Sequence, residues 1–225
     1  VPYSVGRDNL ITALLLACFV FGAIALSKSR GFMSRQARRF FRASRDDAGA
    51  LTETSSELRF QFFLMMQTCL LMSLVTFFYI QTYVTDTFVV DQYVVIGAFF
   101  AIFVTYVMLK MLLQWLCGIV FFSRRRNESW MKSLLFIMSI EGLCLLPVVL
   151  LHAYFGFSVG NTLLSVSVVV IFSKILSFYK IYNIFFRRRE AILQFFLYFC
   201  ALEIMPVFAL LGILGMAGDY LKVNF

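Results

Sequence analysis

Residues 93–122 read YVVIGAFFAIFVTYVMLKMLLQWLCGIVFF, and this stretch decides the fold. It contains 30 residues and a single charged side chain, Lys110. A helix that crosses a bilayer needs about 20 mostly apolar residues, so the stretch predicts a membrane-spanning helix. As one helix it would be about 45 Å long, and it must therefore tilt, kink or leave a hydrocarbon core of about 30 Å before Phe122.

The whole chain has the same apolar character. Of its 225 residues, 61% are hydrophobic and only 14% are charged, whereas about 25% are charged in a typical soluble domain. A soluble fold of this size has too little interior to hide so much apolar surface. The composition therefore excludes a soluble enzyme, a disordered chain and a nucleic-acid-binding domain, and predicts an all-α polytopic membrane protein.

Six apolar runs are long enough to cross a membrane. The predicted spans are residues 10–26, 58–81, 93–122, 131–151, 163–186 and 191–216. Because these are continuous apolar runs and not alternating apolar and polar residues, helices are expected in place of barrel strands. We expect residues 1–225 to form a single integral membrane domain.

The lysines and arginines predict how the chain is threaded. Fifteen of the 20 lie in the first, third and fifth connections, two lie on the opposite side, and three lie within spans. Cytoplasmic connections carry the excess of basic residues. We therefore expect a multi-pass protein of the bacterial inner membrane with both termini in the periplasm. The net charge of +8 then records topology and does not indicate a nucleic-acid partner.

The first connection, residues 27–57, is predicted to be a basic cytoplasmic loop. Apolar residues recur at helical spacing over 32–41, which predicts a short helix on the membrane surface. Thr54 and Glu57 form a capping box that would start the second span. The bilayer, with anionic headgroups on its cytoplasmic face, is the expected contact of these arginines; docking of a cytoplasmic partner is the alternative. The expected headgroup contacts are Arg35, Arg38, Arg39, Arg42, Arg124, Arg125, Arg126, Arg187, Arg188 and Arg189.

Charged residues inside the spans are the most informative pattern, because each costs about 2.5–3.5 kcal/mol at the helix centre. Four of them lie 13–15 residues, or about 20–22 Å along a helix, from the arginine triplets 124–126 and 187–189. These four are Lys110, Glu141, Lys174 and Glu203; the fifth, Lys180, lies closer to the cytoplasmic end and is expected to snorkel.

The same order of features occurs twice. In spans three–four and again in spans five–six, a lysine precedes an arginine triplet, then a glutamate, then Pro147 or Pro206. This predicts two repeated helical hairpins related by an axis along the membrane normal. We expect buried pairs Lys110–Glu141 and Lys174–Glu203, or the same pairs exchanged between hairpins. The two prolines are expected to break their helices and free backbone carbonyls.

Two interpretations of the four buried charges stay open. The pairs can lock helix packing, or they can form a pathway for an ion, a proton or a substrate. Four glutamines on spans two and three are expected to bond between helices: Gln61, Gln67, Gln81 and Gln114.

No motif supports catalysis, and no metal or cofactor is expected. The five cysteines form no CxxC pair, and His152, the only histidine, has no accompanying nucleophile. We therefore expect a protein that is not an enzyme; a membrane-embedded enzyme is a third possibility that no motif supports.

Within the last span, residues 197–206 read LYFCALEIMP. This stretch resembles the C-terminal signature of an uncharacterised family of Bacteroidota inner-membrane proteins. The resemblance extends to the Arg-rich first loop, to Arg59-Phe60-Gln61 and to Gly142-Leu143 with Pro147. It implies a location and a fold and supplies no activity. It singles out Glu203 and Pro206, the residues that the depth of the charges also indicates.

Two functions follow from the sequence. The first is a non-catalytic subunit or accessory factor of a larger cell-envelope complex, in contact with other membrane subunits or with further copies of itself. This interpretation is favoured by the small chain, the short outer loops and the lack of catalytic motifs. The alternative is a small transporter or proton-conducting protein that uses the buried Lys and Glu residues.

Overall fold

The computed structural model describes residues 9–41, 55–83, 92–121, 124–185 and 200–221. Every regular element in these ranges is a helix, as the continuous apolar runs predict. The helices are α1 (Asn9–Phe41), α2 (Ser55–Tyr83), α3 (Gln92–Phe121), α4 (Arg124–Phe155), α5 (Val159–Phe185), the π-helical turn η2 (Cys200–Ile204) and α7 (Met205–Leu221).

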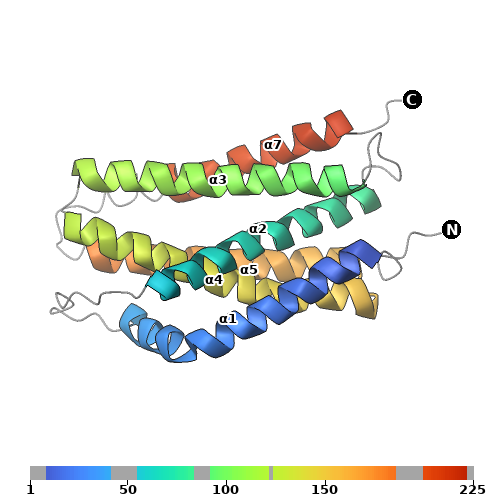
Figure 1. The fold of residues 1–225 in the computed structure, drawn as a ribbon. Coiled ribbons are helices and arrows are strands. Elements are labelled where there is room, and N and C mark those ends of the chain that lie inside the picture. The colour runs from blue at the N-terminus through green and yellow to red at the C-terminus, as the bar shows by residue number, and fades with distance from the viewer. Residues whose placement is uncertain (1–8, 42–54, 84–91, 122–123, 186–199, 222–225) are drawn as a thin grey trace.

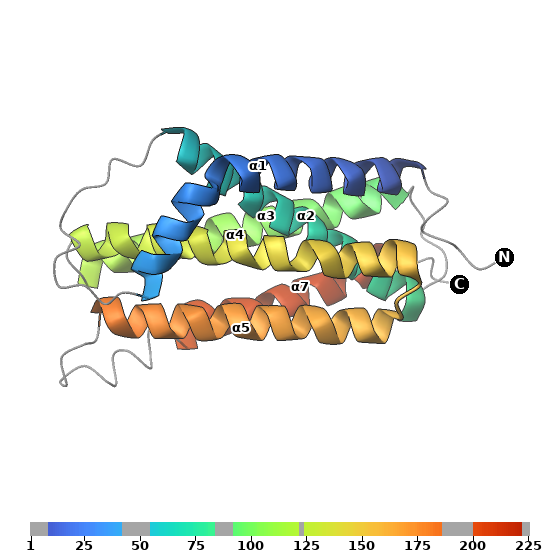
Figure 2. The ribbon, with the colours of Figure 1, turned by 90° about the horizontal axis from the view of Figure 1, so that it is seen from below.

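Five of the described helices are long and apolar enough to cross a membrane, and residues 11–24 of α1 form a shorter apolar segment. A helical multi-pass architecture is thus confirmed, whereas the count of six spans stays a prediction. The helices run alternately up and down along one axis (Figures 1 and 2), so that the start of α1 and the end of α7 lie at the same end of the bundle. Residues 191–199 of the predicted last span lie outside the described ranges.

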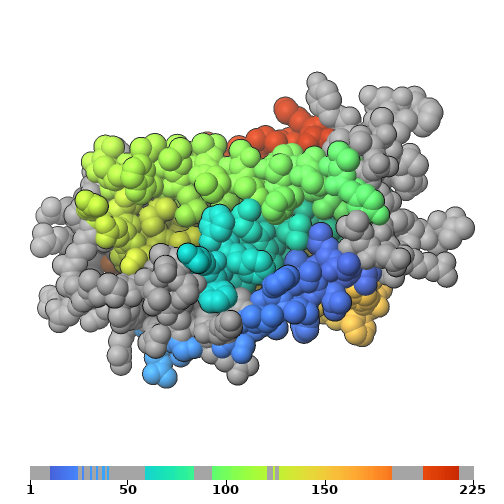
Figure 3. All heavy atoms as spheres, viewed as in Figure 1, coloured from blue at the N-terminus to red at the C-terminus, as the bar shows by residue number. Residues whose placement is uncertain are grey.

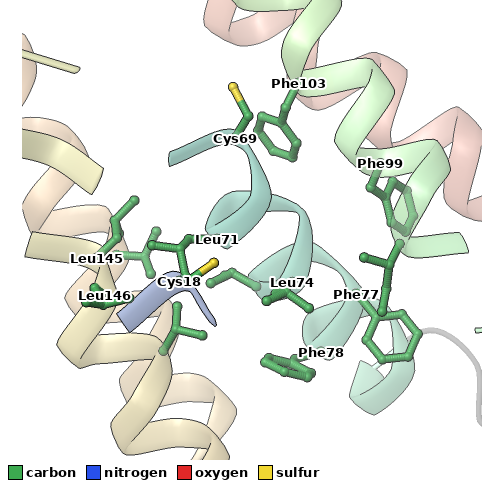
Figure 4. Close-up of a cluster of buried hydrophobic side chains, with 14 of the residues drawn as sticks. Cys18, Cys69, Leu71, Leu74, Phe77, Phe78, Phe99, Phe103, Leu145 and Leu146 are labelled. Carbon is green, nitrogen blue, oxygen red and sulfur yellow. The ribbon is translucent and has the colours of Figure 1, made fainter. Parts of the chain in front are cut away.

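Helix α2 is the centre of the bundle. It contacts α1, α3, α4 and α5. In α2, 67% of the most apolar stretch of 18 residues is buried within the chain, against 17% of residues 200–217. Figure 4 shows its Leu71 near Cys18 of α1 and its Phe77 toward Phe99 of α3. In the space-filling view the surface of α2 emerges between α3 and α1 (Figure 3). The polar residues Gln61, Gln67, Thr68 and Ser73 of α2 are all buried, which agrees with this position because polar side chains of a spanning helix are kept between helices and away from lipid.

A close contact joins α2 to α4. The hydroxyl of Thr68 donates to the carbonyl oxygens of Leu64 (2.8 Å), on its own helix, and Met138 (3.1 Å), across the interface. A Cβ atom at Gly142 would collide with the Thr68 hydroxyl. A glycine at position 142 therefore lets the two helices meet closely enough for the bond between them.

The first helix is longer than predicted. It does not end near residue 26 but continues to Phe41 and bends (Figure 2), so the segment expected as a separate surface helix is its second half. Phe40 is buried near Phe136 of α4, and its carbonyl oxygen accepts a hydrogen bond of 3.2 Å from Lys180 of α5. Lys180 also lies 4.9 Å from the centre of the Phe40 ring. Lys180 thus closes the C-terminal end of α1, and its expected snorkelling stays a prediction.

The arginines predicted to contact headgroups are only partly described. Arg38 and Arg124 are exposed on α1 and α4, and Arg124 is paired with Glu128 at 3.3 Å. The side chains of Arg35, Arg39, Arg125 and Arg126 lie outside the described part of the structure, as do residues 42 and 187–189 altogether. Thr54 of the predicted capping box also lies outside, although α2 begins at the next residue.

The helices do not pack as two separate hairpins. α4 lies mainly against α2 and α5, and α7 lies against α3. The internal repeat thus stays a prediction. α4 and α5 meet at a turn in which Gly156 has a φ of 64°, and the Nδ1 atom of His152 lies 2.7 Å from the Phe157 carbonyl oxygen. His152 thus holds this turn.

Candidate functional site

Glu203 lies in an irregular part of the last span. It belongs to the π-helical turn Cys200–Ile204 and is fully buried, with 0% of its side chain exposed. Pro206, three residues after Glu203, has no N–H to donate to the carbonyl of Leu202, four residues before the proline. The proline therefore explains why the α-helical pattern is interrupted where the glutamate points inward. Single π-helical turns inside α-helices are frequently found at functional sites.

Two lysines from different helices contact the same oxygen of Glu203. The Nζ atom of Lys110 on α3 lies 2.8 Å from Oε2, and the Nζ atom of Lys174 on α5 lies 2.9 Å from it. The second oxygen, Oε1, accepts a hydrogen bond of 2.7 Å from the Nε2 atom of Gln114. Lys110 and Gln114 are four residues apart and lie on one face of α3. We call these four residues, Lys110, Gln114, Lys174 and Glu203, the charge cluster.

The pairing in the charge cluster differs from one expected pair. Lys174 and Glu203 are in contact, but Lys110 is paired with Glu203 on η2 and not with Glu141 on the neighbouring α4. The physical reason is the packing order, because α3 lies against η2 and α7 at this point. Lys110 and Glu203 come from different predicted hairpins, so this contact is an exchange between them.

Among the residues that the structure describes, Glu141 makes no ion pair within 4.0 Å. Its side chain is half-buried on α4, and the charged groups that act on it are Lys174, Lys110 and Glu203. Of the four charged residues that the sequence places at one depth, Glu141 is therefore the one that has no direct contact with the charge cluster.

The charge cluster borders a cavity of about 450 Å³. Such a volume lies in the range of small-molecule sites and equals that of about 15 water molecules. Lys110, Glu141 and Lys174 line it, together with the hydroxyls of Thr68 and Tyr106. The rest of the lining is mostly apolar and comes from α2, α3, α4, α5 and α7. The arrangement can hold a ligand that has both a polar group and an apolar part.

Gln114 and Tyr106 were the site residues with the weakest sequence signal. Gln114 was expected only to join helices, and the signal that it belongs with Lys110 is their i, i+4 spacing. Tyr106 lies one turn on the other side of Lys110 on the same helix. Gln67, another expected inter-helix contact, is buried, and neither its Oε1 nor its Nε2 atom has a hydrogen-bond partner among the described residues. The prediction of a bond from Gln67 is therefore wrong within this part of the chain.

Pro147 does not break its helix. α4 runs continuously from Arg124 to Phe155 with Pro147 inside it, and the proline side chain is exposed. A proline within a spanning helix is tolerated because the freed carbonyl can be satisfied by local adjustments. The expectation of a helix break at Pro147 is therefore wrong.

The cysteines and the metal-binding residues add no second site. Cys18 and Cys69 are buried in the apolar core, and all five cysteines are free. In the described ranges, no group of three or more His, Cys, Asp or Glu side chains could hold a metal ion.

Fold and site together define a multi-pass helical membrane protein whose spans bury a Lys–Glu–Lys cluster beside a cavity. The chain belongs to the family described as a domain of unknown function, DUF4271, whose model matches residues 11–214. The expected membership of an uncharacterised family is thus confirmed. Comparison with curated proteins and with solved structures found no match.

Proposed function

We propose that this protein is a small proton-coupled transporter of the bacterial inner membrane. In this proposal Lys110, Glu141, Lys174 and Glu203 form the site that binds the proton and the transported solute. The observation that carries the proposal is the cavity, which is lined by three of these four charged residues. The fourth, Glu203, lies behind them and holds both lysines.

The exposure of the charges favours a pathway over a purely structural role. Buried ion pairs that only lock helices gain most when both partners are fully enclosed and fully bonded. Here 27% of the Lys174 side chain is exposed, and both Lys174 and Glu141 line the cavity. A charge within the membrane that faces a cavity marks a proton or substrate pathway in many transporters.

The number of charges supports proton binding at this site. With both lysines protonated and Glu203 ionised, the charge cluster carries +1, and an ionised Glu141 makes the set of four residues neutral. In a low-dielectric region a neutral set is favoured over a charged one. Any charge that the cavity gains is therefore best balanced by a proton gained or lost by one of these groups.

The inner-membrane location and the periplasmic termini are part of the proposal. They rest on the distribution of Lys and Arg, because the connections expected in the cytoplasm hold 15 of the 20 basic residues. The even number of crossings that the proposal requires agrees with the start of α1 and the end of α7 at one end of the bundle (Figure 1).

Proton flux in liposomes tests the proposal. The protein is reconstituted in vesicles that contain a pH-sensitive dye, and inward gradients of amino acids, sugars and alkyl sulfonates are applied in turn. At least one solute is expected to acidify the vesicle lumen, and Glu141→Gln is expected to abolish that signal. Glu128→Gln, which changes an exposed glutamate at the end of the bundle, is the matched control. If no solute moves protons faster than in protein-free vesicles, the proposal is wrong.

A second candidate is a subunit of a larger envelope complex or a homo-oligomer. The observation that favours it is the low burial of the last two spans. Only 28% of the most apolar 18-residue stretch of α5, and 17% of residues 200–217, are buried within the chain. Their apolar faces contact either lipid or a partner helix. Purification in mild detergent, followed by light scattering and identification of co-purifying proteins, distinguishes a complex from a homogeneous small transporter.

A further inference from the structure

We infer that the cavity binds an amphipathic monoanion together with one proton, and that Glu141 accepts this proton. The inference rests on the proposed function for the role of the site and goes further, because it names the class of solute and the number of protons.

The charged residues of the cavity lie to one side of a long, mostly apolar stretch of its lining. On α5 the lining runs from Leu163 and Val166, the apolar end, to Ser173, Lys174 and Ser177, the polar end. Leu134 and Ile137 of α4 also line the cavity beyond the charged residues. Residues 163 and 174 are about 16 Å apart along the helix axis. The lining of α7 at the same end as Leu163 is also apolar and comprises Leu210, Leu211 and Leu214. A ligand that fills this space has a polar head near Lys174 and an apolar tail several ångströms long.

The polar end offers hydrogen-bond donors that the described residues do not use. An ammonium group carries three N–H donors. In Lys110 and in Lys174 one of the three is directed to Glu203, and no other described residue accepts from either group. The free donors of Lys174 and Lys110 therefore favour a head group that accepts hydrogen bonds and carries a negative charge.

The cavity reaches the surface of the bundle between α5 and α7. Ile171 of α5 and Leu211 of α7 both line the cavity, and each is 59% exposed. In a membrane this surface faces the hydrocarbon chains. An apolar tail can therefore enter between α5 and α7 from the lipid, whereas a fully polar solute would meet an apolar rim.

The charge balance then fixes the proton. The site is neutral when Glu141 is ionised, so a bound monoanion leaves an uncompensated negative charge in a low-dielectric region, which is costly. One proton removes this charge. Glu141 is the group that takes it, because Glu203 is held by three hydrogen bonds to charged or amide donors, whereas the hydrogen-bond partner of Glu141 among the described residues is the neutral Ser173 hydroxyl.

The groups that face Glu141 from the surrounding helices leave this assignment unchanged. They are Lys110 and Tyr106 of α3, Cys69 of α2, Lys174 and Ser173 of α5, Glu203 of η2, and Cys144 of its own helix. Only the two lysines and Glu203 carry a charge at neutral pH among these, and all three are bonded to one another. In the binding step hydronium or a buffer acid gives up a proton, so that its bond to that proton breaks and an O–H bond forms on the Glu141 carboxylate; no other covalent bond changes.

Calorimetry with decanesulfonate tests the inference. Decanesulfonate is an amphipathic anion that stays ionised at every pH used, so any proton taken up must bind to the protein. The full chain in lipid nanodiscs is titrated in two buffers of different ionisation enthalpy, which gives the number of protons bound. We expect one proton per decanesulfonate and an apparent Kd that rises tenfold per pH unit. Decanol and decyltrimethylammonium, the neutral and the cationic analogues, should bind at least tenfold more weakly.

Three variants separate the parts of the site. Glu141→Gln should bind decanesulfonate without proton uptake and with a Kd that does not change with pH. Leu163→Trp should weaken binding at least tenfold, because the larger ring fills the apolar end of the cavity. Its control is Leu164→Trp, at a neighbouring position that is 66% exposed on the outer face of α5 and should bind as the wild type does. Neither Leu163 nor Glu141 belongs to the charge cluster, so both variants should fold.

Each outcome decides the inference. Proton uptake near one, lost only in Glu141→Gln, supports it. Binding without proton uptake, equal binding of the neutral or cationic analogue, equal binding by Leu163→Trp and Leu164→Trp, or no binding of decanesulfonate would overturn it. Binding with proton uptake but no solute-driven flux in vesicles contradicts the transporter function alone. Flux driven only by amino acids or sugars contradicts this inference alone.

Discussion

Replacement of Glu203 by glutamine removes the one negative charge that both lysines contact. The two Nζ–Oε2 distances are 2.8 and 2.9 Å, and with an effective dielectric constant of about 20 each pair is worth about 6 kcal/mol before desolvation is counted. The net cost is smaller. Removal of one partner from a buried ion pair costs about 3–5 kcal/mol, because the remaining charge is left uncompensated.

The expected effect on thermal stability follows from this cost. For a chain of this length, 1 kcal/mol corresponds to about 2–4 °C in Tm, so Glu203→Gln should lower Tm by about 6–20 °C. The double variant Glu203→Gln/Lys174→Met has lost one positive charge as well. It should recover about 0.5–3 kcal/mol of the loss, the range of coupling between residues in direct contact.

The assay is thermal unfolding in a mild detergent, followed by tryptophan fluorescence, with all variants at one protein concentration. Glu128→Gln provides the control, since its carboxylate forms an exposed pair with Arg124 and its loss should cost at most about 0.5 kcal/mol. If the single and the double variant unfold at the same temperature as the wild type, the charge cluster does not contribute to stability and the reasoning is refuted.

Three further predictions concern packing and topology. Gly142→Ala should lower the free energy of unfolding by about 1–3 kcal/mol, because the new Cβ collides with a side chain of α2. In the control Gly97→Ala, nothing lies within 4 Å of the new Cβ, so the free energy of unfolding should stay unchanged or rise by up to about 1 kcal/mol. An equal loss in both would show that helix packing is not the cause. Lys180→Met removes the hydrogen bond to the last turn of α1 and should speed amide hydrogen exchange in that turn; unchanged exchange would contradict the contact. In a cysteine-free background, Ser158→Cys should react with an impermeant maleimide on intact cells and Arg38→Cys only after permeabilisation, and the reverse pattern would invert the topology.

The helices could be predicted from sequence because each apolar run is much longer than a bilayer requires and contains few charges. Residues 93–122 were expected to form one span, and α3 extends from Gln92 to Phe121 without interruption. The end of the first span could not be predicted. Its boundary near residue 26 was placed where the apolar run ends, but α1 continues because Phe40 finds a buried site against Phe136 and because Lys180 bonds its carbonyl.

The charged residues of the site and the contact of Lys174 with Glu203 could also be predicted from sequence, but the partner of Lys110 could not. Counting residues from the arginine triplets placed the four charged residues at one depth, and depth is independent of which helices are neighbours. The contact of Lys110 with Glu203 depends on α3 lying against η2 and α7, which no spacing in the chain encodes. The cavity was likewise not predictable, because it depends on how far side chains of five helices fill the space between them.

Proton movement driven by decanesulfonate in vesicles tests the central claim most directly. An inward gradient of this anion is applied to vesicles that contain a pH-sensitive dye, and the initial rate of lumen acidification is compared among wild type, Glu141→Gln and Glu128→Gln. If Glu141 carries the proton, wild type and Glu128→Gln acidify the lumen by about one proton per sulfonate and Glu141→Gln does not. Equal acidification by Glu141→Gln and the wild type would contradict the account.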